Sequence, residues 1–376
     1  MTDFREFVPE HIRKLAESNQ AKPLKQAGTV AKPIALNLNE NPFGPSPLAL
    51  AAIRKKLSET NRYPEIQATD LHDVIAKFHG VEANQVLVTA GATELLAIIA
   101  RALLAPGLNA VTSAKSFIVY KLATQVTEGR LIEVPTRNNA YDLDAIKNAI
   151  DPHTRIVFLA NPNNPTGTLV TADEADHFVS HLPAHVLLVL DEAYGDYAAY
   201  FAKRRKIVYS RSLEYLAENR SVIVLKTFSK AHGLAGLRIG YGLASAKLIS
   251  LFAPLRSIFS VSSVAQAAAS AALHDTKHVR RAVKNNAEQV ELLKVRLERF
   301  GFAASETWGN FLYCELGHDA SSLADRLRKH GIIVQPLGLW GAPNAIRVSV
   351  GTPEQNAKFL KALETVRGTM RPLVSR

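Results

Sequence analysis

The sequence contains a single cysteine, Cys314, among its 376 residues. One thiol excludes an internal disulfide framework, and such sparing use of cysteine is typical of proteins from the reducing cytoplasm. No apolar run is long enough to span a bilayer, and the first residues lack the apolar core of a secretion signal. We therefore expect a cytoplasmic protein without a membrane segment.

Metal-ligand spacing is also missing, since neither the cysteine nor the twelve histidines form a recognisable ligand pattern. No Gly-x-Ser-x-Gly segment marks a serine hydrolase. The formal net charge of +11 raises the question of nucleic-acid binding, with 203–206 as the densest basic cluster. Most lysines and arginines are interspersed with acids and no nucleic-acid motif accompanies them, so we favour a solvated basic face that attracts anionic ligands.

The length of the chain exceeds the usual range of one domain and predicts two. Short apolar runs at 85–89, 109–112, 131–135, 155–160, 186–190 and 222–225 alternate with helical patterns. This alternation predicts an α/β fold with a mostly parallel sheet and helices on both faces. Near residue 262 the pattern changes to an alanine-rich stretch and a long charged helix. We expect an arm over 1–35, a large cofactor-binding domain over 36–262 and a small α+β domain over 263–376.

The segment 227–238 is the most informative part of the sequence, because it combines a lysine with hydroxyls and an arginine. Lys230 can form a Schiff base, while Thr227, Ser229 and Arg238 are suited to holding a phosphate. Pyridoxal 5'-phosphate requires both, an amine for its aldehyde and an anchor for its phosphate. A lone lysine of this kind is more often a solvated surface charge. The residues at the other strand ends therefore determine whether a cofactor site is the better interpretation.

Chemistry-bearing residues follow three more of the predicted strands, at the edge where parallel sheets bind ligands. The strand at 85–89 leads into 91–94, where a helix start would suit a phosphate, although an ordinary N-cap looks the same. The strand at 155–160 leads into 161–167, whose two Asn-Pro pairs fix a turn that can aim a side-chain amide.

The strand at 186–190 ends at Asp191, with Tyr194 on the same turn. A carboxylate at the tip of a buried strand is costly without a partner, and a cationic pyridinium nitrogen would be one. Four such strand ends in order predict a cofactor site, whereas each alone has an ordinary structural explanation.

With these segments the chain resembles the fold-type I aminotransferases, and more narrowly the histidinol-phosphate aminotransferase family of the class I/II group. The resemblance runs from about residue 34 to 352. It is carried by 39–46, 62–64, 91–94, 161–167, 191–194, 229–230 with Arg238, and 346–352. It implies pyridoxal 5'-phosphate as cofactor, a homodimer, and amino transfer by alternating half-reactions with an acceptor such as 2-oxoglutarate.

The resemblance also implies the role of each matching residue. Lys230 would bind the cofactor covalently and shuttle the proton, and Asp191 would keep the ring nitrogen protonated. Asn164 and Tyr194 would hold the phenolic oxygen, and Phe117 would stack on the ring. The phosphate would be held by Ala92, Thr93, Thr227, Ser229 and Arg238, with Tyr63 reaching the neighbouring subunit's phosphate. Arg347 would bind the substrate carboxylate, which suits its planar fork.

Two departures from the family pattern bear on the substrate. A proline-tyrosine pair of the family's arm is replaced by Glu17-Ser18, and an arginine is replaced by Gln335. Losing a full charge should weaken phosphate recognition. We therefore keep an aromatic amino acid as an alternative donor to histidinol phosphate. The residues that are candidates to supply the missing charge are Lys22, Lys25 and Lys115. Lys115 and Trp340 also depart from the family pattern, which more often has proline and tyrosine there.

Two other function classes compete with transamination. A decarboxylase on the same scaffold, similar to threonine-phosphate decarboxylase, would keep the lysine and phosphate motifs, and the segment around Arg347 favours transamination over it. A non-enzymatic regulator with an aminotransferase-like module would need an added DNA-binding domain. The aminotransferase pattern begins by Ile34, which leaves no room for one.

Overall fold

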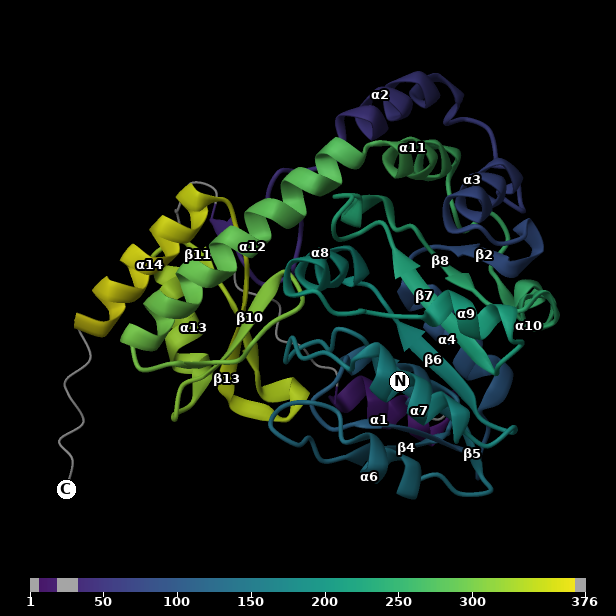
Figure 1. Cartoon of the computed structure of the whole chain (residues 1–376), viewed down its shortest axis with the longest axis horizontal. Coiled ribbons are helices and arrows are strands. Elements are labelled where there is room, and N and C mark those ends of the chain that lie inside the picture. Colours follow the sequence, from purple (N-terminus) through teal and green to yellow (C-terminus); the bar gives the residue numbers. More distant parts are fainter. Residues whose placement is uncertain (1–6, 19–32, 369–376) are drawn as a thin grey trace.

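The computed structural model describes residues 7–18 and 33–368. Figure 1 shows a large central sheet with helices around it and, beside it, a smaller sheet covered by helices from the C-terminal part of the chain. The long helix α12 (Thr276–Arg299) runs between these two bodies. The α/β class with a mostly parallel sheet and a smaller α+β body is confirmed.

Within residues 33–368, seven strands form the large sheet in the order β2-β8-β7-β6-β5-β3-β4. Their bounds are β2 (Val86–Thr89), β3 (Asn109–Ser113), β4 (Arg130–Val134), β5 (Thr154–Ala160), β6 (Leu187–Asp191), β7 (Val222–Thr227) and β8 (Gly240–Leu243). Strand β8 is antiparallel to both neighbours, and the other pairs are parallel. Strand β8 is not predicted by the sequence pattern, because two of its four residues are glycines, which disfavour strands. A Cβ on Gly240 would lie 2.8 Å from the Ala92 nitrogen, so glycine is required there.

Both faces of the large sheet are covered, which explains why its strands read as continuous apolar runs. Ile156 and Phe158 pack on one face, while Val157 and Leu159 pack on the other. The first face carries α4 (Ala92–Leu103), α5 (Ile118–Val126) and α10 (Ala246–Phe252). The second carries α3 (Thr69–His79), α6 (Leu143–Asn148), α7 (Ala172–Ser180), α9 (Ser212–Ala217) and α11 (Ser263–His274), with α2 (Pro47–Lys56) against α11.

The smaller body is built on a sheet with the order β12-β13-β10-β9. Its strands are β9 (Ala303–Ala304), β10 (Phe311–Glu315), β12 (Gln335–Leu337) and β13 (Ala342–Ser349), and its helices are α12, α13 (Ala320–Lys329) and α14 (Pro353–Gly368). A parallel pair of β1 (Ile34–Ala35) and β11 (Ile332–Ile333) joins the start of the chain to this body. Helix α1 (Glu10–Ser18) packs instead against α5 of the large body.

The division of the chain at residue 262 stays a prediction. Helix α11 lies beyond that point, yet its Ala268 and Ala272 are fully buried in the core of the large body. Helix α8 (Gly195–Arg205) does the reverse, since Phe201 belongs to the core of the smaller body. The packing therefore favours a boundary near Asp275, where α11 ends and α12 begins.

Candidate active site

A cavity of about 420 Å³ opens where the carboxyl ends of the large sheet face the smaller body. Every residue predicted for the site except Tyr63 lines this cavity: Ala92, Thr93, Phe117, Asn164, Asp191, Tyr194, Thr227, Ser229, Lys230, Arg238, Gln335 and Arg347. Four loops that follow strands β2, β5, β6 and β7 thus converge, as the order of the motifs predicted. Asn39, Glu40 and Trp340 line the same cavity and had no predicted role in the site.

Asp191 is the last residue of β6 and is 5% exposed. Its Oδ2 accepts a hydrogen bond from Tyr120 at 3.0 Å, and its Oδ1 accepts one from the Ala193 amide at 3.1 Å. Burial raises the pKa of this carboxyl, against the lowering effect of the Tyr120 hydrogen bond. A buried carboxylate at a cavity wall is suited to a cationic partner, and the protonated ring nitrogen of pyridoxal 5'-phosphate fits that requirement.

Lys230 lies in the loop after β7, with its amine inside the cavity. Its Nζ donates to the Leu38 carbonyl at 2.9 Å and lies 5.6 Å from the centre of the Tyr194 ring. Burial, followed by repulsion from Arg347, lowers the pKa of this amine to about 8, although Glu40 and Asp191 act in the opposite direction. A substantial fraction of the amine is therefore neutral near pH 8, which is the form that attacks an aldehyde.

The other end of the cavity is suited to a phosphate. Helix α4 begins at Ala92, and the positive end of its dipole faces the loop after β7. Arg238 adopts φ 51°, and a Cβ on Gly91 would lie only 2.8 Å from its NH2. Thr227 Oγ1 donates to Ser229 Oγ at 3.0 Å and accepts from the Ser229 amide at 3.1 Å. Helix amides, hydroxyls and a guanidinium together form an anion cradle, so the residues present fit the expected cofactor at both ends.

Arg347 is contributed by the smaller body, from β13, and is 4% exposed. Its NH1 donates to Asn164 Oδ1, and its NH2 donates to the Asn37 carbonyl at 2.7 Å. The guanidinium carbon lies 5.6 Å from the centre of the Phe311 ring and 5.8 Å from that of Trp340. Its Nε is buried and finds no partner among the described residues. A planar cation held by two hydrogen bonds and lying near two aromatic rings is arranged to bind a carboxylate.

The hydroxyl of Tyr194 is held in place by Asn39, in the segment that follows β1. It accepts a hydrogen bond from Asn39 Nδ2 at 2.9 Å. Asn39 is itself fixed by Ser349, whose Oγ accepts from the Asn39 amide at 2.8 Å and donates to Asn39 Oδ1 at 2.9 Å. Burial raises the pKa of Tyr194, and nearby Arg347 opposes this shift. The phenol is therefore neutral and oriented, which suits a donor to an anionic oxygen.

Gln335 lies directly beside Arg347, because these residues are paired across strands β12 and β13. Its Nε2 donates to the carbonyl of its own neighbour, Pro336, at 2.9 Å. Trp340 lines the same wall, and its buried Nε1 is without a hydrogen-bond acceptor in residues 7–18 and 33–368. This wall offers amide and indole groups where the family pattern led us to expect a cation.

The other candidates for that missing charge are placed differently. Lys115 Nζ donates to Asn139 Oδ1 at 2.8 Å and to the Tyr313 hydroxyl at 3.2 Å, and it lies 3.5 Å from Glu315. Its charge is thus already paired outside the cavity lining. Lys22 and Lys25 lie outside the described residues. Glu17 is exposed near the end of α1.

Tyr63 is not brought into the cavity of its own chain. Its side chain is 81% exposed and stacks on Phe259, with ring centres 4.5 Å apart. Ile258 and Ile66 are also exposed large apolar side chains of these two segments, at 71% and 45%. The placement is compatible with the predicted contribution to a neighbouring subunit, and that contribution stays a prediction.

Sequence analysis missed Tyr120, Asn39 and Trp340 as parts of the site. Tyr120 lies one helical turn after Phe117, but only the packing of α5 against β6 shows that its hydroxyl reaches Asp191. In the described ranges, no cluster of three or more histidine, cysteine or acidic side chains is arranged for a metal ion. Nor does any helix in those ranges have the length and apolar character needed to cross a membrane.

Comparisons with known proteins agree with this geometry. The sequence profile of the family described as aminotransferase class I and II matches residues 31–363. A protein named histidinol-phosphate aminotransferase 2 from Pseudomonas fluorescens is 40% identical over 369 residues, which cover 97% of this chain and 98% of the relative.

Solved structures extend the comparison to the fold. Histidinol-phosphate aminotransferase from Sinorhizobium meliloti, in complex with pyridoxal 5'-phosphate, matches with a TM-score of 0.84 and 30% identity, over 94% of this chain and 99% of that one. L-threonine-O-3-phosphate decarboxylase from Porphyromonas gingivalis matches with a TM-score of 0.75 and 23% identity, over 89% and 100% of the two chains. At that lower identity the likeness shows the fold alone. The chain belongs to the class I and II aminotransferases and, among them, to the histidinol-phosphate aminotransferase family of pyridoxal-phosphate-dependent transaminases.

Proposed function

We propose that this transaminase moves an amino group from histidinol phosphate to a 2-oxo acid such as 2-oxoglutarate, a step of histidine biosynthesis. The observation that carries the proposal is that Lys230 and Arg347 line the same cavity. Lys230 would hold the cofactor that accepts the amino group, and Arg347 offers a binding site for a carboxylate. The names of relatives such as the Pseudomonas fluorescens protein support histidinol phosphate as the donor.

The cofactor would be held at both ends by this chain. Asp191 would pair with its ring nitrogen, Phe117 would contact the ring, and Asn164 with Tyr194 would hold the phenolic oxygen. The phosphate would be bound by Ala92, Thr93, Thr227, Ser229 and Arg238. When bound, pyridoxal 5'-phosphate supplies an electron sink that makes the α proton of an amine substrate acidic.

Residues of the chain itself would then stabilise the charge of the ring and transfer the proton. Asp191 stays ionised beside a cation, because the attraction offsets the burial that raises its pKa in the structure. Lys230 Nζ is the only amine that lines the cavity among the described residues, so it is placed to take up and return the α proton. Its lowered pKa, about 8, keeps enough of the amine neutral to act as a base.

Arg347 would bind the carboxylate of each amino or 2-oxo acid. Two hydrogen bonds, to Asn164 Oδ1 and to the Asn37 carbonyl, use only part of the five N–H donors of the guanidinium, so donors remain for a further acceptor. Histidinol phosphate carries a phosphorylated hydroxymethyl group in place of the carboxylate, so Arg347 would face an anionic group in both half-reactions, a planar carboxylate in the 2-oxo acid and a phosphate in the donor.

An aromatic amino acid, such as phenylalanine, is the second candidate donor. Gln335 and Trp340 favour it, since they give the wall beside Arg347 an uncharged and partly aromatic surface. An uncharged ring needs no cation at that wall, whereas a phosphate does.

We also propose a homodimer in which Tyr63 reaches the phosphate site of the partner subunit. Its 81% exposure and the exposed apolar side chains beside it support a contact that a single chain does not make. The cytoplasmic location stays a prediction from the sequence.

The test is a half-reaction screen with purified holoenzyme. Histidinol phosphate, phenylalanine, tyrosine, histidine and glutamate are mixed separately with the enzyme, and conversion of the bound cofactor to pyridoxamine phosphate is followed by absorbance. Fast conversion at low histidinol phosphate concentration supports the first proposal. Conversion by phenylalanine or tyrosine with histidinol phosphate inert supports the second. Release of carbon dioxide without conversion of the cofactor would contradict both and indicate a decarboxylase.

A further inference from the structure

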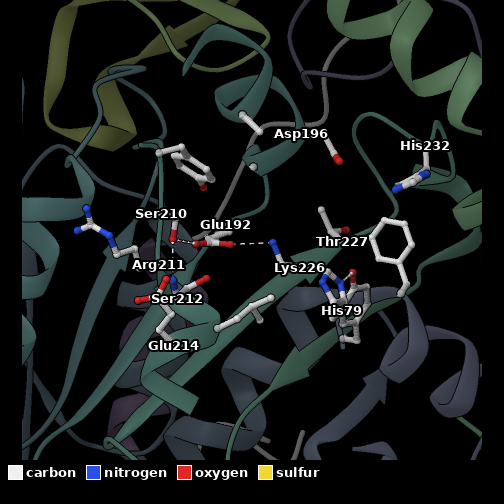
Figure 2. A pocket seen from close by; sticks show the side chains of 16 residues that line it. His79, Glu192, Asp196, Ser210, Arg211, Ser212, Glu214, Lys226, Thr227 and His232 are labelled. Atoms are coloured by element: carbon white, nitrogen blue, oxygen red, sulfur yellow. Dashed lines mark hydrogen bonds and ion pairs between the residues drawn. The ribbon is translucent and has the colours of Figure 1, made fainter. Parts of the chain in front are cut away.

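A second cavity, of about 410 Å³, lies on the other side of the loop ends of β6 and β7. Figure 2 shows its lining, in which Glu192 stands between Ser210 and Lys226. Lys226 Nζ lies 2.7 Å from Glu192 Oε2, and Ser210 Oγ donates to Glu192 Oε1 at 2.6 Å. Thr227 lines both this cavity and the active site, so the two spaces share a wall.

The pair is charged despite its burial. The side chain of Glu192 is 1% exposed and that of Lys226 is 21% exposed. Burial opposes both charges, but the attraction to Lys226 and its hydrogen bond lower the pKa of Glu192. In the same way, burial opposes the charge of Lys226, and attraction to Glu192 still raises its pKa. A buried ion pair generally adds little to the free energy of unfolding compared with apolar side chains of the same size. We therefore expect the pair to have a role other than stability.

The position of the pair in the chain points to that role. Glu192 directly follows Asp191, and Lys226 directly precedes Thr227. The two strands are hydrogen-bonded neighbours up to this level, since Asp191 is paired with Leu225 and the Glu192 amide donates to the Leu225 carbonyl at 2.9 Å. Successive side chains of a strand point to opposite faces. The ion pair therefore ties the two strand ends together on the face away from Asp191.

We propose that the ion pair of Glu192 and Lys226 is a positioning device, which fixes the spacing between Asp191 and Thr227 so that one rigid cofactor engages both. The inference rests on the proposed roles of Asp191 at the ring and Thr227 at the phosphate. Neither Glu192 nor Lys226 lines the active-site cavity, so the pair acts through its neighbours and not on the reacting atoms.

A comparison of two ligands tests this role. Pyridoxal 5'-phosphate would engage both Asp191 and the phosphate anchor at Thr227, while pyridoxal, which lacks the phosphate, would engage Asp191 and Lys230 but not the phosphate anchor. Affinities of both are measured by absorbance titration of the cofactor-free full-length chain. We expect Glu192→Gln and Lys226→Met to weaken binding of pyridoxal 5'-phosphate by about 10- to 100-fold, because a shifted phosphate anchor loses a hydrogen bond to a charged group, which is worth about this much in affinity. Binding of pyridoxal should change by less than about threefold, since it does not depend on the spacing.

Three further variants serve as controls for this comparison. Lys226→Arg preserves the charge and should restore most of the affinity for pyridoxal 5'-phosphate. Glu192→Asp keeps both charges but shortens the bridge, and it serves if the uncharged variants do not fold, with the same selective loss expected at several-fold size. Arg211→Met removes a cation from the same cavity, where it is paired with Asp173 and Asp176, and should leave both affinities unchanged.

Two results would overturn the proposal. Equal losses for pyridoxal 5'-phosphate and pyridoxal in the pair variants would show a general structural role, and unchanged affinities would show no role. A wild-type chain that binds the two ligands equally well would instead contradict the proposed phosphate site. That outcome is distinguishable, because it is read from the wild-type chain before any variant is compared.

Discussion

The two walls of the active-site cavity differ in origin and in how completely their polar atoms are paired. Asp191 and Thr227 sit at ends of neighbouring parallel strands of the large sheet, and both have close hydrogen-bond partners. The opposite wall comes from the small sheet. There Arg347 Nε and Trp340 Nε1 lack partners among the described residues, and Gln335 bonds to its own neighbour. We infer that the first wall, which we call the strand-end wall, is arranged in advance for a ligand that stays the same. The second wall, the small-sheet wall, keeps hydrogen-bond donors for a ligand that changes.

The largest effect is expected on the strand-end wall, from Lys230→Ala. The variant loses the only amine that lines the cavity in the described part of the chain, and with it the group proposed as both covalent anchor and base. We expect the rate of the half-reaction to fall by at least about 1000-fold. Single-turnover absorbance measurements check this. A variant that keeps a tenth of the rate would show that another group removes the proton.

Asp191→Asn should follow with a loss of about 100-fold, because a neutral amide does not keep a ring nitrogen protonated. Tyr120→Phe is its matched control, since it removes only the hydrogen bond to Asp191 Oδ2. We expect the control to cost about tenfold or less. The comparison is made on single-turnover rates with saturating cofactor. Equal losses in the two variants would mean that the carboxylate has no special role.

On the small-sheet wall, Arg347→Lys should raise the KM for 2-oxoglutarate by about 10- to 100-fold, because lysine lacks the planar fork that binds a carboxylate. The KM for histidinol phosphate should change by only a few-fold, because lysine still binds a phosphate as a point charge. Steady-state kinetics with each substrate varied in turn separate the two. A parallel rise in both KM values would contradict the idea that the planar fork of Arg347 selects a carboxylate.

Gln335→Arg should improve the use of histidinol phosphate relative to phenylalanine by about tenfold, since it restores a cation beside the substrate. The measurement is the ratio of kcat/KM for the two donors. Gln335→Lys is a control that adds charge without the planar fork, and it should give a smaller change. An unchanged ranking in Gln335→Arg would contradict the idea that this residue sets the choice of donor.

The smallest effect is a shift in pH dependence that couples the two walls. If Lys230 captures the cofactor as proposed, only its neutral amine does so, and the capture rate of the cofactor-free chain should rise with pH to a plateau with a midpoint at about 8. Arg347 lowers the pKa of Lys230, second only to burial. Arg347→Met should therefore move the midpoint to higher pH. Stopped-flow absorbance across pH 6–10 measures this midpoint. An unchanged midpoint in Arg347→Met would show that the charge of Arg347 does not affect the pKa of Lys230.

The strand-end wall could be predicted from the sequence more fully than the small-sheet wall. Residues such as Asp191 and Lys230 follow apolar strands in a fixed order, and a parallel sheet brings all such ends to one edge. Tyr120 and Asn39 escaped notice because their contacts depend on how α5 and the start of the chain pack, which short-range patterns do not contain. The position of Trp340 was noted as unusual, but its place beside Arg347 follows from the pairing of β12 and β13, which the sequence analysis did not predict.

Locating the cofactor on the chain would test the assignment of the active site most decisively. Holoenzyme is treated with borohydride, which fixes the lysine–cofactor bond, then digested with trypsin and analysed by mass spectrometry. We expect the added mass on Lys230, within the peptide 227–238 that cleavage after Lys226 and Arg238 releases. Addition to Lys226, to Lys115 or to no single lysine would contradict the assignment of this cavity as the active site.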